Sequence, residues 1–143
     1  MSGVRIHNTV AGTRVPRTRL MRLAEIVLHG QGVAKSVNLI LVADGTMRQL
    51  NRRFRRRDKT TDVLSFAMEE ETDPLLGEIY ISIPTAKRNA EGDGRKLDEE
   101  LLQLFCHGLL HLSGIHHPST RARAEMKRLE DQYLLQLAKD KKR

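Results

Sequence analysis

The sequence predicts a single α+β domain in which a small mixed sheet of about four strands packs with about five helices. The chain has 143 residues, which is the size of one domain with its own core, and no repeat or long linker divides it. Apolar residues make up 39% of the chain and charged residues 30%, a balance typical of globular proteins. Segments with the apolar pattern of strands alternate with segments of helical spacing.

Four short segments have the composition of strands. Residues 4–10 form the first, and residues 36–43 are β-branched and apolar, as in a buried strand. Residues 62–68 form a third segment after a charged loop. Residues 78–83 alternate polar and apolar side chains, as expected of a half-buried strand.

Apolar side chains at helical spacing predict the helices between and after these strands. Helix starts are indicated by Pro and Asp, and stops by Gly. The predicted helices run from Pro16 to Gly30, from the N-cap Asp44 through Phe54, from Pro84 to about residue 90, over 97–112, and onward from Pro118.

The helix over 97–112 carries two histidines four residues apart, His107 and His111, which therefore point to the same side. Gly114 can turn the chain out of the helix, so that His117 returns to the same point. Three neutral imidazoles leave one tetrahedral position open, which is the layout of a catalytic zinc site. We therefore predict one Zn²⁺ held by His107, His111 and His117 at the end of a central helix, although nickel, cobalt or copper also suit such ligands.

The spacing of these residues is that of the metzincin peptidases, H-x-x-x-H-x-x-G-x-x-H. Those enzymes place a glutamate directly after the first histidine as general base, and this chain has Gly108 there. RNA carries its own nucleophile, the 2′-OH, so a missing carboxylate harms RNA cleavage less than peptide cleavage. His116 is an alternative third ligand, and Cys106 is interpreted as a core residue.

The chain carries 25 Lys and Arg against 18 Asp and Glu, a formal charge of +7 that favours an anionic partner such as nucleic acid. The densest basic run lies over residues 48–59, and its alternative interpretation is a solvated helix end and loop. Aromatic residues make up only 3% of the chain, and the single aromatic residue within the run, Phe54, belongs to the apolar spacing of the predicted helix. Sequence-specific readout of RNA by base stacking is therefore not expected.

Cys106 is the one cysteine, which excludes an internal disulfide and favours a reducing cytoplasm. The first residues lack the apolar core of a signal peptide, and no apolar run has the length of a membrane span. We expect a cytoplasmic protein without membrane partners.

Two sequence blocks resemble the YbeY family of bacterial rRNA maturation factors, which are metal-dependent endoribonucleases. Residues 50–66, LNRRFRRRDKTTDVLSF, are similar to the family pattern L-N-x-x-[FY]-R-x-x-D-x-P-T-D-V-L-S-F. Residues 107–117, HGLLHLSGIHH, are similar to H-G-x-L-H-L-x-G-[YF]-D-H, and residues 76–79 (LGEI) to L-G-D-I. The chain departs from the family at Thr60, Ala67, Ile115 and His116, but no departure removes His107, His111, His117 or Arg55.

This resemblance implies one metallo-hydrolase domain over residues 1–143, with a zinc ion on the three histidines and Arg55 acting beside them in catalysis. It implies a single-stranded RNA substrate and processing of small-subunit rRNA near its 3′ end. Ribosome assembly and quality control, contact with the small subunit and its proteins, and no role on DNA also follow from it.

Two other functions fit parts of the sequence. A metallopeptidase would use the same histidines, but Gly108 leaves it without its base. A non-catalytic RNA- or ribosome-binding assembly factor would hold a structural zinc, against which the open fourth position argues.

Overall fold

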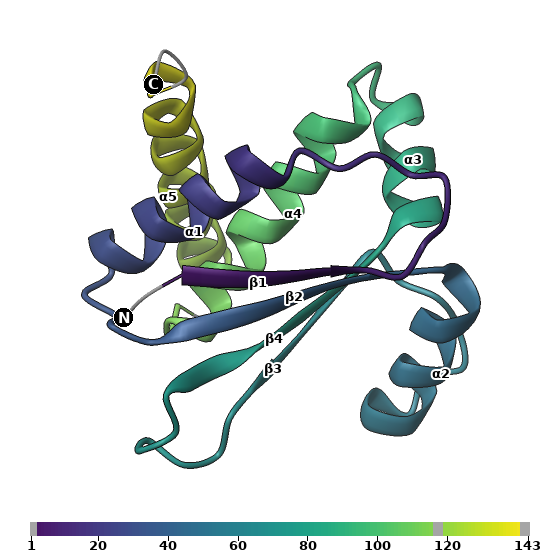
Figure 1. Cartoon of the computed structure of the whole chain (residues 1–143), viewed down its shortest axis with the longest axis horizontal. Helices are drawn as coiled ribbons and strands as arrows, with labels where there is room; N and C mark the ends of the chain where they lie inside the picture. The colour runs from purple at the N-terminus through teal and green to yellow at the C-terminus, as the bar shows by residue number, and fades with distance from the viewer. Residues whose placement is uncertain (1–2, 116–118, 141–143) are drawn as a thin grey trace.

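The computed structural model describes residues 3–115 and 119–140 and confirms the predicted α+β architecture (Figure 1). Each predicted strand and helix is found, with ends that differ by a few residues. The largest difference is in the fourth strand, which begins at Leu75 rather than at residue 78. The elements are β1 (Gly3–Asn8), α1 (Arg17–Gly30), β2 (Ser36–Val42), α2 (Asp44–Arg55), β3 (Val63–Ala67), β4 (Leu75–Ser82), α3 (Ile83–Gly92), α4 (Leu97–Leu112) and α5 (Thr120–Lys139).

The four strands form one mixed sheet in the order β1-β2-β4-β3. The strands β1, β2 and β4 are parallel, and β3 pairs antiparallel with β4 at the edge of the sheet. The amide of Ser82 donates to the carbonyl of Asp62, which makes these two residues a hydrogen-bonded pair of the ladder. Because such pairs alternate along an antiparallel ladder, the peptide groups of Val63, Ser65 and Ala67 point away from β4 to the open edge.

Helices α1, α3 and α4 cover one face of the sheet, and α5 packs against α1 and α4 on the same side (Figure 1). Alternate residues of β2 and β4, such as Leu39 and Ile79, are fully buried beneath them. Helix α4 crosses the middle of this layer and buries Phe105 and Leu109 in the same cluster. A helix that is apolar over most of its surface is expected in such a central position.

Two glycines let α4 lie very close to β3 and β4. A Cβ atom at Gly77 would lie 2.5 Å from the carbonyl oxygen of Phe66 and 2.8 Å from the side chain of Leu112. A Cβ atom at Gly108 would lie 3.0 Å from Ile79 and 3.1 Å from the hydroxyl oxygen of Ser65. The histidine-bearing end of α4 is therefore held directly against the edge of the sheet.

Helix α2 packs on the opposite face, where it covers one end of the sheet (Figure 1). A small cluster of Val42, Met47 and Leu64 anchors it there. The helix ends at Arg55 because Arg56 takes the left-handed conformation, with φ of 57°.

Asp44 was predicted to be the N-cap of α2, but the N-cap is Ala43 and Asp44 is the first helical residue. Its carboxylate instead accepts hydrogen bonds from Ser82 Oγ at 2.6 Å, Thr85 Oγ1 at 2.7 Å and Arg88 Nη2 at 2.7 Å. Burial alone raises the pKa of Asp44, but these hydrogen bonds and the charge of Arg88 outweigh it and lower the pKa to about 2. This carboxylate joins the start of α2 to the start of α3.

Asp44 is expected to make the stability of the fold fall in acid. Its pKa is lower in the folded chain than the 3.8 of a free aspartate, so its contribution is complete above about pH 4 and is lost as the pH falls toward 2. We expect Asp44→Asn to cost about 1–2 kcal/mol at neutral pH, after discounting for solvent screening, and nothing below about pH 2. Urea unfolding of both proteins across this range measures the difference. Asp58→Asn is the control, because its exposed pair with Arg48 contributes little; an equal loss in both variants would contradict the prediction.

Candidate functional site

Helix α4 presents His107 and His111 one turn apart, near its carboxyl end. The acidic residues Asp98, Glu99 and Glu100 stabilise its first turn, where the helix dipole favours negative charge. The helix spans Leu97–Leu112, as predicted, and the chain leaves it through Gly114, whose φ is 101°. Both histidines are partly buried.

His107 is held by a carboxylate that was not among the residues predicted for the site. Its Nδ1 atom lies 2.6 Å from Oε2 of Glu130 on α5, and Glu130 is only 5% exposed. The hydrogen bond to Glu130 raises the pKa of His107, and the charges of Glu130 and Asp62 raise it further. Together they outweigh burial, which lowers the pKa. A carboxylate acceptor at Nδ1 places the ring proton there, so Nε2 is the nitrogen that His107 would offer to a metal.

A signal for Glu130 does exist in the sequence. Met126, Glu130, Tyr133 and Leu137 lie at helical spacing along α5, and all four are buried. A carboxylate within such an apolar stripe needs a partner inside the protein. The stripe alone does not say that the partner is His107.

The predicted third ligand, His117, and its alternative, His116, lie outside the described residues. Within residues 3–115 and 119–140, no set of three His, Cys, Asp or Glu side chains converges as a metal site would require. The described residues thus bring together two of the three predicted ligands on one face of α4. Cys106 is fully buried, and burial raises the pKa of its thiol to about 12, as suits a core residue.

Arg55 lies at the carboxyl end of α2 and reaches the open edge of β3. Its Nη2 atom donates to the carbonyl oxygen of Ser65 at 3.1 Å, and its guanidinium lies over the ring of Phe66, 5.5 Å from the centroid. The hydroxyl of Ser65 is on the other face of the sheet, against Gly108. Arg55 and the histidine helix therefore approach the same residue of the edge strand from opposite faces.

A basic hollow lies beside Arg55. Asn51 Nδ2 donates to the carbonyl oxygen of Lys59 at 2.9 Å, which folds the loop after α2 back against the helix. This loop brings further cations and hydroxyl groups next to Arg55, and they suit an anion. The hollow is lined by Asn51, Arg55, Arg57, Lys59, Thr60, Thr61 and Leu64.

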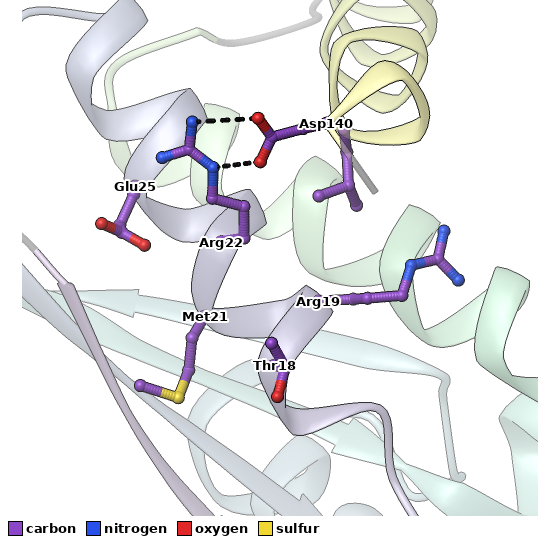
Figure 2. A pocket seen from close by; sticks show the side chains of 7 residues that line it. Thr18, Arg19, Met21, Arg22, Glu25 and Asp140 are labelled. Atoms are coloured by element: carbon purple, nitrogen blue, oxygen red, sulfur yellow. Dashed lines mark hydrogen bonds and ion pairs between the residues drawn. The ribbon is translucent and has the colours of Figure 1, made fainter. Parts of the chain in front are cut away.

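Another pocket lies between α1 and the end of α5, where Arg22 and Asp140 form an ion pair (Figure 2). Thr18, Met21 and Glu25 of α1 also line it. It contains none of the predicted site residues.

In the described part of the chain, each helix lacks either the length or the apolar character that crossing a membrane requires.

The sequence model of the endoribonuclease YbeY family matches residues 5–138 of the chain. The chain belongs to this family. A YbeY endoribonuclease of Nautilia profundicola is 45% identical over 103 residues, which cover 72% of this chain and 73% of that protein. The YbeY endoribonuclease of Thermus thermophilus is 39% identical over 133 residues, which cover 87% of this chain and 96% of the relative.

The YbeY fold is also similar to a solved structure, the solution structure of TM1509 from Thermotoga maritima. The TM-score is 0.69 with 29% sequence identity, and the match covers 97% of this chain and 91% of that one. The similarity thus extends over nearly the whole chain.

Proposed function

We propose that this member of the YbeY family is a zinc-dependent endoribonuclease that cleaves single-stranded RNA. Its biological role would be processing of small-subunit rRNA at the 3′ end, with ribosome assembly and quality control. The observation that carries the proposal is that the helix bearing the histidine pair packs through Gly108 against Ser65, whose carbonyl oxygen is bound by Arg55 of the basic segment. The family match over residues 5–138 supports the reaction class.

The described side chains fit a zinc ion. His107 and His111 supply imidazole nitrogens one helical turn apart, and Glu130 accepts from Nδ1 of His107, as a carboxylate does in many histidine–zinc sites. We propose His117 as the third ligand. A bound zinc ion would supply Lewis-acid charge at a phosphoryl oxygen and lower the pKa of a water molecule.

The chain's own cations would place the phosphate. We propose that Arg55, fixed by Ser65 and Phe66, donates to the phosphoryl oxygens and stabilises the negative charge that builds on them in the transition state. Arg57 and Lys59, which line the same hollow, would hold neighbouring phosphates of the strand.

Close packing explains why a peptidase is the weaker alternative. The general base of metzincins would occupy position 108, where even a Cβ atom would lie 3.0 Å from Ile79. A glutamate there would require α4 to move away from the sheet. The glycine is thus needed for the packing that holds the histidines against β3.

The wider setting follows from the same proposal. Residues 1–143 would act as one metallo-hydrolase domain in the cytoplasm, with single-stranded rRNA, the small ribosomal subunit and its proteins as partners. The formal charge of +7 supports an anionic partner. We propose no role on DNA or at a membrane.

Chelation tests the proposal. We expect the purified protein to cleave single-stranded RNA, to lose that activity completely after treatment with a chelator, and to regain it with stoichiometric Zn²⁺. His107→Ala and His111→Ala should be inactive and contain less metal, whereas His29→Ala on α1 should behave as the wild type. Casein cleavage would favour a peptidase, and RNA binding without cleavage under any metal would favour a non-catalytic assembly factor.

A further inference from the structure

The face of the sheet that carries α2 gathers three aromatic side chains that are distant in the sequence. Phe54 of α2 lies edge-on to Phe66 of β3 with ring centroids 5.2 Å apart, and Phe66 lies edge-on to Tyr80 of β4 at 5.8 Å. Phe66 and Tyr80 are partly buried, but Phe54 is 56% exposed. The row therefore runs from the sheet outward and ends in an aromatic ring open to solvent.

Cations lie beside this row. The guanidinium of Arg53 lies 5.4 Å from the centroid of Phe54, and that of Arg55 lies 5.5 Å from the centroid of Phe66. Six of the eight residues in 52–59 are Arg or Lys, and the one acidic residue, Asp58, pairs with Arg48. The ring of Phe54 is thus held in place by Phe66 and Arg53 while much of it remains open to solvent within a positively charged surface.

We propose that Phe54, with Arg53 and Arg55, forms a stacking platform for one unpaired base of a single RNA strand. An exposed aromatic ring can stack on any base, and adjacent guanidinium groups hold the phosphates on either side. The charge of this segment selects a polyanion over an apolar protein partner.

The position of the platform relates it to the proposed active site and rests on that proposed function. Arg55 contacts both Phe66, against which Phe54 packs, and the carbonyl of Ser65, whose side chain faces α4. A strand stacked on Phe54 would pass the edge of β3 at Arg55 and reach the histidine side. The platform would thereby favour unpaired RNA, because a base within a duplex cannot offer its face to Phe54.

Binding to metal-free protein tests the platform separately from cleavage. A labelled single-stranded oligonucleotide of about ten nucleotides is compared with an abasic ribose-phosphate chain of equal length and charge, by fluorescence anisotropy. We expect the wild type to prefer the base-bearing chain by about 5- to 150-fold, the effect of one stacked base. Phe54→Ala should lose this preference without weakening abasic binding or changing its salt dependence, and Phe54→Tyr should keep it.

Leu135→Ala is the matched control, because Leu135 is equally exposed, at 57%, but lies on α5. The chain has no tryptophan, so Phe54→Trp also introduces a single fluorophore whose emission a stacked base should quench. An unchanged base preference in a folded Phe54→Ala protein, or unquenched emission with bound RNA, would overturn the platform. If the zinc-loaded wild type failed to cleave RNA but the metal-free protein still preferred the base-bearing chain, only the proposed enzymatic function would be rejected.

Discussion

Replacing Arg55 with glutamate is expected to abolish RNA cleavage while the metal content of the protein stays that of the wild type. Arg55 is the cation fixed beside Ser65, and removing one preorganised donor to a developing charge commonly costs 100-fold or more in rate. Reversing its charge would also repel the phosphate. Single-turnover cleavage of a labelled RNA, with metal analysis of the same samples, measures both quantities.

The structure also defines the controls for this variant. Glutamate at position 55 would place a carboxylate near the carbonyl of Ser65 and at the carboxyl end of α2, so the thermal stability of each variant must be measured. Arg19→Glu makes the same change in charge on the exposed side of α1 and should keep nearly full activity. Arg55→Lys should be intermediate, because lysine keeps the charge but lacks the planar fork. Full activity of Arg55→Glu would defeat the proposed role of this residue.

Replacing Glu130 with alanine is expected to weaken metal binding by about 10- to 100-fold, although Glu130 would not touch the metal. Glu130 fixes which nitrogen of His107 carries the proton, and it does so from a buried position on a different helix. Competition against a chromophoric chelator measures the affinity. Nitrogen NMR of the metal-free protein should show the Nδ1-protonated tautomer of His107 in the wild type and a mixture in Glu130→Ala.

Two variants separate positioning from folding in this experiment. Glu130→Gln still accepts a hydrogen bond from Nδ1, so its loss of affinity should be smaller than that of Glu130→Ala. Glu125→Gln alters a carboxylate on the same helix that pairs with Arg128 at the surface, and it should bind metal normally. Wild-type affinity in a folded Glu130→Ala protein would show that His107 needs no partner.

The sequence predicted the elements well because their signals are local. Apolar spacing and the stop at Gly114 were sufficient for the limits of α4, and proline at the start of α3 was sufficient for its position. Asp44 was predicted to be the N-cap of α2 but is its first helical residue. Its carboxylate instead binds Ser82 and Thr85, which come from a distant part of the chain. Local pattern cannot indicate such a network.

The candidate site also has one part that local sequence pattern predicts and another that only the folded chain brings together. His107 and His111 could be paired from helical spacing alone, whereas the arrangement around Ser65 depends on β3 lying beneath Gly108. The aromatic residues illustrate the limit most directly. Phe54, Phe66 and Tyr80 are scattered in sequence and gave no reason to expect stacking, but the packing of α2 on the sheet brings them into one row.

The open edge of β3 has a consequence for handling the protein. Peptide groups exposed along an edge strand are a template on which a second copy can add its own strand and start aggregation. Arg55, the last residue of α2, lies at this edge, and the arginines of the same basic run add positive charge that repels a second copy. Variants that neutralise several of them would lose this protection together with any affinity for RNA, so their solubility should be followed by light scattering before a weak binding signal is interpreted.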